Sequence, residues 1–396
     1  MTGKTATLGR ADSPSRSRPS GLHIAVMLRA LDEHGGIAVY TRNILEELLR
    51  LDDSSRYTLL YSSPENVGRY ADRPNVTERF LPAFNSLAWD QAAVPRALAR
   101  SGADVVFHPK FTVPLATSVP SVMMLHGADW FFPEQAQYYN RLNAWYMRRV
   151  LPLFCRRAAL ILSVSKLTTE NIHRAVRLPE GKVRTVYFAP GRHFRRVGDR
   201  EELDRVRQRY GLPERFILTL SKPLGDQRKN LAGVLEGYRR FHGRTDHKLV
   251  VGGKDCEAYR EAYGLPNAGW GADVLFPGWI DQRDLPAVYS LADLYLYPSN
   301  LEAFPIPITE AMACGTPIVT SDANGLREIA GDAAVRVDPD DPQAVCEAVY
   351  EVITDRRLHD ELSARGLERA QRFSWDRCAL ETLGVLREAA SRTSGR

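Results

Sequence analysis

Two glutamates, Glu302 and Glu310, stand eight residues apart in the segment Tyr297–Glu328 and offer two carboxylates to one ligand. A helix is predicted to begin after Glu302 and to include Glu310, because proline is tolerated at a helix start and Gly315 is typical of a helix end. The N-terminus of a helix carries free N–H groups and a partial positive charge, which suits a diphosphate or sugar hydroxyls. Since glutamates also favour first turns for structural reasons, the pair alone leaves a ligand site and a plain helix start equally open.

A second group of charged residues follows the predicted strand Phe216–Leu220. Lys222, Arg228 and Lys229 precede a helix that is predicted to begin at Asn230. Cations at a helix start are locally unfavourable to the helix dipole, which favours a binding role over a purely structural one. Such cations can neutralise the charge that develops on a leaving diphosphate.

The first half of the chain places glycines and histidines at the ends of predicted strands. Gly35 and Gly36 lie between a strand and a helix, where glycine lets backbone N–H groups approach a phosphate. His108 and His126 each follow an apolar strand, and Asp129 comes three residues after the second of them. Open α/β sheets bind ligands at the carboxyl ends of their strands. A glycine pair can equally form a turn, and a strand-end histidine can equally be structural.

The elements that must position these residues alternate short apolar strands with amphipathic helices. The expected strands are His23–Leu28, Tyr57–Tyr61, Asp104–His108, Ser121–Leu125, Leu160–Val164 and Val183–Tyr187, then Phe216–Leu220, Lys248–Val251, Val274–Phe276, Leu294–Tyr297, Pro317–Thr320 and Ala334–Val337. The expected helices include Ile37–Leu51, Asn140–Arg157, Asn230–Phe241, Asp284–Leu291, Pro307–Cys314 and Pro342–Asp355. This alternation predicts an α/β protein with two doubly wound domains, each a parallel sheet covered on both faces.

The domain boundaries follow from composition. Residues 1–20 are rich in Ser, Thr, Arg and Pro and are expected to form a disordered tail. The charged segment Arg192–Gly211 lacks strand patterns, so one domain is expected over residues 21–193 and another over residues 194–374. A last helix is expected within residues 375–396. Three of the five net positive charges lie in the tail, which leaves little basic character for a nucleic-acid partner.

Cysteine usage and hydropathy limit the class of protein. The five cysteines are scattered without a C-x-x-C motif, which predicts reduced thiols in the cytoplasm and no metal site. No apolar run reaches the length of a signal peptide or a membrane span. Residues 130–157 mix aromatic side chains with arginines at helical spacing. That pattern fits a peripheral membrane or lipid-pyrophosphate contact, or a solvated basic face opposite an aromatic core stripe.

The Tyr297–Glu328 segment resembles the signature of glycosyltransferase family 4, the retaining enzymes that use nucleotide sugars. The matching residues are Pro298, Ser299, Glu302, Phe304, Pro307, Glu310, Ala311, Met312, Ala313, Gly315, Pro317 and Val319. Ala303 and Pro305 stand where the family usually has glycine, and Pro305 has no backbone N–H to offer a sugar. The resemblance implies a GT-B fold, in which two Rossmann-like domains face each other across a cleft. It also implies that the last helix packs back on the first domain.

The resemblance implies roles for the residues singled out above. Glu310 would hold the ribose hydroxyls, Glu302 would contact the transferred sugar, and His126 would sit beside its anomeric centre. Arg228 and Lys229 would stabilise the departing diphosphate. The implied donor site comprises Gly35, Gly36, Lys222, Asp281, Phe304, Ile306 and Glu310. His108 and Asp129 are expected on the acceptor side.

The expected activity is hexose transfer with retention of configuration. GDP-mannose is favoured slightly over a UDP-sugar as donor, because Asp281 could accept hydrogen bonds from guanine. A saccharide, a lipid-linked sugar or a small molecule would be the acceptor, and no metal or other cofactor is expected. Three alternatives stay open: a nucleotide-sugar epimerase of related architecture, a sugar phosphorylase, and a catalytically silent sugar-nucleotide-binding protein.

Overall fold

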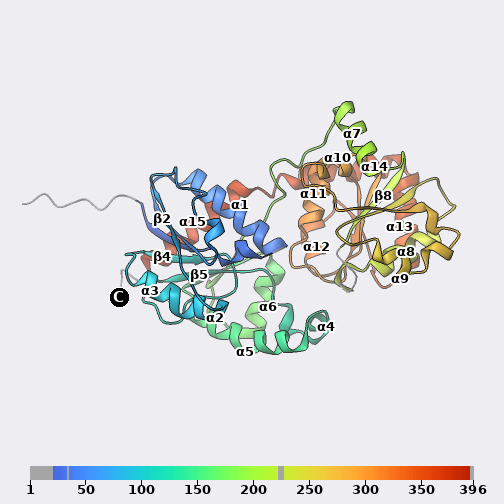
Figure 1. Ribbon diagram of the computed structural model, residues 1–396. Helices are drawn as coiled ribbons and strands as arrows, with labels where there is room; N and C mark the ends of the chain where they lie inside the picture. Colours follow the sequence, from blue (N-terminus) through green and yellow to red (C-terminus); the bar gives the residue numbers. More distant parts are fainter. Residues whose placement is uncertain (1–20, 34, 222–226, 393–396) are drawn as a thin grey trace, which may run out of the picture.

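The computed structural model describes residues 21–33, 35–221 and 227–392, and Lys222 therefore lies outside the described residues. The chain forms two α/β domains, each built on one parallel sheet, and they lie side by side (Figure 1). The predicted architecture of two doubly wound, Rossmann-like domains is thereby confirmed.

The first domain contains a seven-stranded sheet of order β3-β2-β1-β4-β5-β6-β7. Its strands are β1 (His23–Met27), β2 (Arg56–Tyr61), β3 (Val76–Phe80), β4 (Val105–His108), β5 (Ser121–Leu125), β6 (Leu160–Ser163) and β7 (Val183–Thr185). Its helices are α1 (Gly36–Leu51), α2 (Ser86–Ala88), α3 (Val94–Leu98), α4 (Pro133–Ala136), α5 (Arg141–Arg157) and α6 (Lys166–Val176). Every residue of β1, β4, β5 and β6 is buried, as expected for parallel strands covered on both faces.

The second domain contains a six-stranded sheet of order β10-β9-β8-β11-β12-β13. Its strands are β8 (Phe216–Leu220), β9 (Lys248–Gly252), β10 (Val274–Gly278), β11 (Leu294–Tyr297), β12 (Ile318–Ser321) and β13 (Val335–Val337). Its helices are α7 (Arg200–Tyr210), α8 (Leu231–Phe241), α9 (Ala258–Ala262), α10 (Leu285–Leu291), α11 (Ile306–Cys314), α12 (Asn324–Ala330), α13 (Pro342–Thr354) and α14 (Arg356–Ala370). All six strands that the sequence predicts for this half are present.

Two features of the fold differ from the sequence expectation. Strand β3 was not predicted, because it is a largely exposed edge strand whose sequence, VTERF, carries no apolar run. Helix α7 lies within the segment predicted as a connection and packs against α10 of the second domain. Asp284, before α10, accepts from Arg205 at 2.8 Å and from Arg209 at 2.7 Å. Half of the predicted connection is therefore part of the second domain.

The last helix, α15 (Trp375–Ser391), packs against α1 and against strands β4, β5 and β6 of the first domain. Figure 1 shows this red helix among the blue elements that begin the chain. The Ser374 hydroxyl caps its first turn by accepting from the Arg377 N–H at 3.2 Å. The indole of Trp375 is buried and stacks on Phe188 with the ring centroids 6.1 Å apart. The chain thus crosses between the domains twice.

A carboxylate from the second domain holds the start of a helix in the first. Glu328, on α12, accepts from the backbone N–H groups of Lys166 at 2.8 Å and Leu167 at 3.0 Å, which open α6. The Tyr187 hydroxyl donates to the same carboxylate at 2.7 Å. A negative charge at a helix N-terminus is also favoured by the helix dipole. This contact ties the second domain to the first.

Replacing Glu328 with alanine is expected to lower the free energy of unfolding by roughly 1–3 kcal/mol, because three hydrogen bonds to a charged group are lost. Urea unfolding monitored by tryptophan fluorescence measures this change. Glu381→Ala is the matched control, since Glu381 pairs with the exposed Arg377 on its own helix. That control variant should lower the free energy of unfolding by at most about 0.5 kcal/mol. Equal losses in both variants would contradict the interdomain role of Glu328.

Candidate functional site

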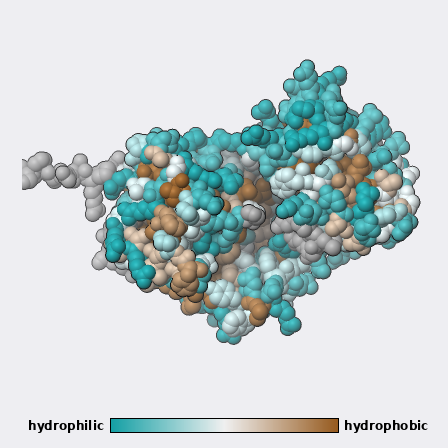
Figure 2. All heavy atoms as spheres, viewed as in Figure 1, coloured by the Kyte–Doolittle hydropathy of each residue, from teal (hydrophilic) through white to brown (hydrophobic). Residues whose placement is uncertain are grey.

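A cavity of about 310 Å³ lies between the two domains, and Figure 2 shows the surface hollowed where they face each other. Both domains contribute side chains to it. The residues that line this central cavity are Glu33, Gly35, Gly36, Ile37, Phe111, His126, Gly127, Asp129, Trp130, Tyr139, Val164, Phe188, Arg228, Phe304 and Ile306. Of the residues predicted for the site, the structure brings together here Gly35, Gly36, His126, Asp129, Arg228, Phe304 and Ile306.

Next to this cavity, Glu302 and Lys229 form an ion pair. Both side chains are largely buried, and Tyr297, at the end of β11, donates its hydroxyl to Glu302 Oε1 at 2.7 Å. Lys229 Nζ also contacts the Tyr297 hydroxyl and lies 4.8 Å from the centre of its ring. Tyr297 thus fixes both charges at the carboxyl end of a central strand, a role that sequence reasoning missed.

The loops that carry these two charges are hydrogen-bonded to each other. The Arg228 carbonyl accepts from the Ser299 hydroxyl at 2.6 Å and from the Asn300 N–H at 2.7 Å. Asn230 adopts a left-handed backbone with φ of 50° and caps α8. Its side-chain amide donates to the carbonyl of Pro298 at 3.1 Å. Within the triplet Arg228–Lys229–Asn230, the asparagine is therefore explained by its role in shaping this loop and capping α8.

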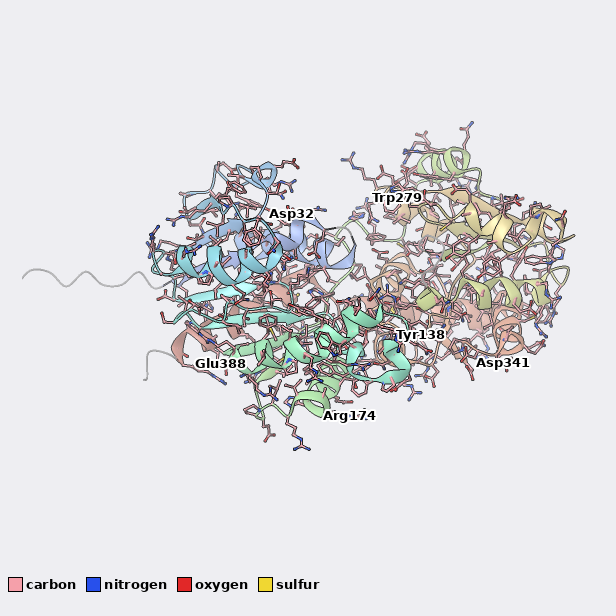
Figure 3. All side chains as sticks on the ribbon, turned by 60° about the horizontal axis from the view of Figure 1, so that its bottom comes forward. Asp32, Tyr138, Arg174, Trp279, Asp341 and Glu388 are labelled. Carbon is pink, nitrogen blue, oxygen red and sulfur yellow. The ribbon has the colours of Figure 1, made fainter. Side chains whose placement is uncertain are left out.

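Arg228 reaches toward an acid and a phenol of the first domain. Its guanidinium lies 5.6 Å from the ring centre of Tyr139, and the Tyr139 hydroxyl donates to Asp129 Oδ2 at 2.9 Å. Burial raises the pKa of Asp129, the Glu302 charge raises it further, and Arg228 opposes the rise. Figure 3 shows the adjacent Tyr138 at the edge of the first domain that faces the second. These residues join the two domains at the cavity.

His126 is enclosed by aromatic rings at the end of β5. Tyr40, Phe111 and Phe188 lie with their ring centres 5.2, 6.2 and 5.6 Å from the imidazole. Burial lowers the pKa of His126 to about 4, so the ring is neutral near pH 7. Because its Nε2 lies 2.9 Å from the Pro109 carbonyl, Nε2 carries the proton and Nδ1 keeps a lone pair. This imidazole can accept a hydrogen bond from a ligand hydroxyl but is not set up to donate a proton.

The glycine pair opens α1, a helix that begins beside the cavity. Gly35 has φ of 108°, a left-handed conformation that favours glycine, and it precedes the first turn of α1. A Cβ added to Gly35 or Gly36 would meet no atom of the described residues within 4 Å. The start of α1 is thus uncrowded on the side of these Cβ positions, and the N-terminus of a helix favours an anion.

Glu310 lines an adjoining cavity of about 370 Å³, which shares Ile306 with the central one. It lies one turn along α11 from Ile306 and accepts from the Tyr289 hydroxyl at 3.2 Å. Burial raises the pKa of Glu310 to about 7. Arg192, Gln282 and Trp375 also line this second space. Glu310 therefore lines the adjoining cavity, whereas Glu302 pairs with Lys229 beside the central one.

The Ala303 position is closely packed against the first domain. A Cβ added to Gly127 would lie 3.5 Å from the Cβ of Ala303 and 3.1 Å from Asp129 Oδ2. Pro305 precedes α11 and supplies no N–H at the mouth of the cavity. The two departures from the family signature thus flank Phe304, which lines the central cavity.

Four of the described predicted residues line neither cavity: Lys229 and Glu302, which pair beside the central one, and His108 and Asp281. His108 is buried, and its Nδ1 lies 2.8 Å from the Thr112 hydroxyl beneath the loop that holds His126. The Asp281 carboxylate accepts from the Arg283 N–H at 2.9 Å and closes the turn before α10. Contact of either residue with a ligand stays a prediction. Within residues 21–33, 35–221 and 227–392, no three His, Cys, Asp or Glu side chains are grouped to hold a metal ion.

Comparison with known proteins assigns each half of the chain to a family. Residues 34–188 match the profile described as Glycosyltransferase Family 4, and residues 203–369 match the profile described as Glycosyl transferases group 1. The O-antigen chain mannosyltransferase B of Escherichia coli is 29% identical over 291 residues, which cover 71% of this chain and 74% of that protein.

A second relative is much longer than this chain. The serotype-specific mannosyltransferase WbdA of Escherichia coli is 26% identical over 241 residues, and the match spans 58% of this chain but only 29% of that protein. Among solved structures, sucrose-phosphate synthase from Thermosynechococcus elongatus superimposes with a TM-score of 0.75 at 19% identity, covering 94% of this chain and 100% of that one. At that identity the likeness shows the GT-B fold alone.

Proposed function

This chain belongs to glycosyltransferase family 4, and we propose on that premise that it transfers a mannosyl group from GDP-mannose to a hydroxyl acceptor. The observation that carries the proposal is the Lys229–Glu302 pair, held by Tyr297 beside a cavity that His126 closes from the other domain. The similarity to mannosyltransferases favours a mannosyl donor. A UDP-sugar is the next candidate donor.

The proposed reaction retains the configuration of the sugar. The bond between the anomeric carbon and the diphosphate oxygen breaks, and its electron pair stays on the leaving GDP. The acceptor oxygen forms the new bond from the same face, and its proton passes to the leaving phosphate. Lys229 and Arg228 stabilise the charge that develops on that diphosphate, which is the main electrostatic demand of the transition state. The free N–H groups that begin α1 favour the same anion.

The remaining side chains hold the donor. The neutral His126 accepts a hydrogen bond from a hydroxyl of the sugar through Nδ1, and Glu302 accepts from another. Glu310 accepts from the ribose hydroxyls in the adjoining cavity. Asp129 lies on the acceptor side, where Tyr139 orients its carboxyl group.

A thermal-shift screen of the full chain against GDP, UDP, dTDP and ADP, with and without EDTA, tests the donor. GDP is expected to raise the midpoint most, because a ligand that binds only the folded state adds about 2.7 kcal/mol of stability at a hundredfold excess over Kd. EDTA is expected to leave that shift unchanged, since the proposed diphosphate site uses cationic side chains and helix N–H groups.

The outcomes separate the proposal from its alternatives. A larger shift with UDP would overturn GDP-mannose as the donor, and no shift with any diphosphate would favour a catalytically silent protein. Incubation of the enzyme with the donor alone distinguishes an epimerase, which would convert the sugar without an acceptor. Loss of the GDP shift in EDTA would overturn the metal-free site.

A further inference from the structure

Helix α5 presents an apolar and aromatic stripe to solvent. Its seventeen residues contain five arginines and no acidic residue. Leu142, Trp145, Tyr146 and Leu153 are exposed by 78, 60, 43 and 53%, respectively. Their spacing of three, four and seven residues places them on one face of the helix. Burial of large side chains in the domain core therefore does not explain this face.

Positive charge lies within the same stripe. Arg149 and Arg156 follow Trp145 and Leu153 by four and three residues, so they share the exposed face. Arg148 and Arg157 flank it, and their guanidinium groups donate to the backbone carbonyls of Trp130 and Leu115. Among the residues that the structure describes, none of the α5 arginines makes an ion pair with a carboxylate. The charge of this face is thus left for an external partner.

The apolar area continues beyond the helix. The Arg157 contact brings the exposed Leu115 beside the end of α5, and Gln91 in turn accepts from the Leu115 N–H at 2.9 Å. Gln91 follows α2, in which Leu87 is exposed, and the exposed Phe84 lies two residues before that helix. Figure 2 shows brown atoms along the lower edge of the first domain, where Figure 1 places α2 and α5. Figure 3 turns this surface toward the viewer.

We propose that this surface, the α5 face, binds a membrane that contains anionic lipid. Exposed leucine, tryptophan and tyrosine side chains enter the boundary between head groups and acyl chains, and arginines pair with lipid phosphates. The contact is peripheral, since none of the described helices is long and apolar enough to cross a membrane. A second copy of this chain is a poorer partner, because a two-fold interface would set each group of arginines against its own copy.

The α5 face lies close to the central cavity. Tyr139 lines that cavity, and α5 begins two residues later, at Arg141. Seating the face on lipid therefore brings the first-domain rim of the cavity near the membrane surface. If the proposed transferase function holds, this geometry suits an acceptor that is anchored in the membrane by a lipid. The membrane contact itself does not depend on that function.

Co-sedimentation of the full chain with lipid vesicles tests the contact. The protein is expected to bind vesicles of equal parts phosphatidylcholine and phosphatidylglycerol, and to release from them as salt screens the charge. Binding to phosphatidylcholine alone should be far weaker. The double variant Arg149→Gln and Arg156→Gln should bind roughly thirtyfold more weakly, at about fivefold for each arginine near an anionic surface. Leu142→Ser with Trp145→Ser should also lose binding.

Matched controls remove equal charge or apolar area elsewhere. Arg356→Gln with Arg357→Gln removes two exposed cations from α14, and Leu380→Ser removes an exposed leucine from α15, so both should bind like the parent. No binding to the anionic vesicles, or equal binding by all variants, would overturn the proposal. A dimer in solution that Trp145→Ser dissociates would instead assign the face to a second copy. The vesicle assay contains no sugar or nucleotide, so a failure to bind lipid leaves the proposed donor untouched. A failure of the GDP screen likewise leaves the result of the vesicle assay untouched.

Discussion

Replacing Lys229 with alanine is expected to lower kcat by roughly 10²- to 10³-fold, the usual loss when one preorganised transition-state partner is removed. The donor KM should change much less, because the charge on the diphosphate grows only as the bond to the sugar breaks. The structure supports an effect on kcat rather than on KM, since Lys229 is held against Glu302 and the Tyr297 hydroxyl at the edge of the interdomain cavity. An ammonium fixed in this way needs little reorganisation during the reaction.

Steady-state kinetics with varied donor measure both parameters for Lys229→Ala. Lys248→Ala is the matched control, because Lys248 pairs with Asp273 at 3.1 Å at the opposite end of the parallel strands. That variant should keep its kcat within a factor of about two, as expected for a surface ion pair remote from the site. A rise in KM of that size, with little change in kcat, would contradict the transition-state role of Lys229. Thermal unfolding of each variant excludes loss of fold as the cause.

The strands that carry the site could be predicted because they are buried on both faces. Runs such as FILTL in β8 and LYLY in β11 are dominated by aliphatic and aromatic residues, which marks central parallel strands. Strand β3 lacks that signal, because it is an edge strand that solvent reaches. Hydrophobic patterning therefore predicts the strands of the sheets, except for an edge strand that does not contribute to a core.

The chemistry of the site could be predicted only in part. Glu302 and Lys229 were identified by local motifs, yet their pairing joins residues 73 positions apart. Tyr297 reads as one more apolar strand residue, so its hydroxyl gives no sequence signal. Asp129 could be placed near His126 by spacing, but its contact with Tyr139 depends on how α4 folds back. Side-chain contacts across loops and domains are set by tertiary packing, which local patterns do not encode.

Replacing Glu310 with alanine is expected to raise the donor KM by roughly ten- to a hundredfold, with kcat much less affected. The proposed hydrogen bonds from the ribose hydroxyls go to a carboxylate, and bonds to a charged group contribute about 1.5–3 kcal/mol. These bonds are made equally in the ground state and in the transition state, so their loss weakens binding rather than the chemical step. The donor KM of Glu310→Gln should fall between those of the parent and the alanine variant, because the amide oxygen can still accept a hydrogen bond.

The pH dependence of donor affinity follows from the position of Glu310 in the adjoining cavity. Burial raises the pKa of this carboxyl group to about 7, above the value near 4.5 of an exposed glutamate. The folded state therefore holds this proton more tightly than the unfolded state does, and the resulting stabilisation is lost as pH rises through 7. A ligand that donates hydrogen bonds to the carboxylate favours the ionised form.

GDP affinity of the parent protein should consequently fall as pH drops from 8 toward 6, with a midpoint of about 7 that bound ligand shifts downward. Isothermal titration of GDP across this range measures the change directly. Glu310→Gln removes the titrating group, so its affinity should be nearly flat over the same interval. A parent profile that is also flat would mean that the ribose does not reach this carboxylate. The proposal that the ribose binds in the adjoining cavity would then fail.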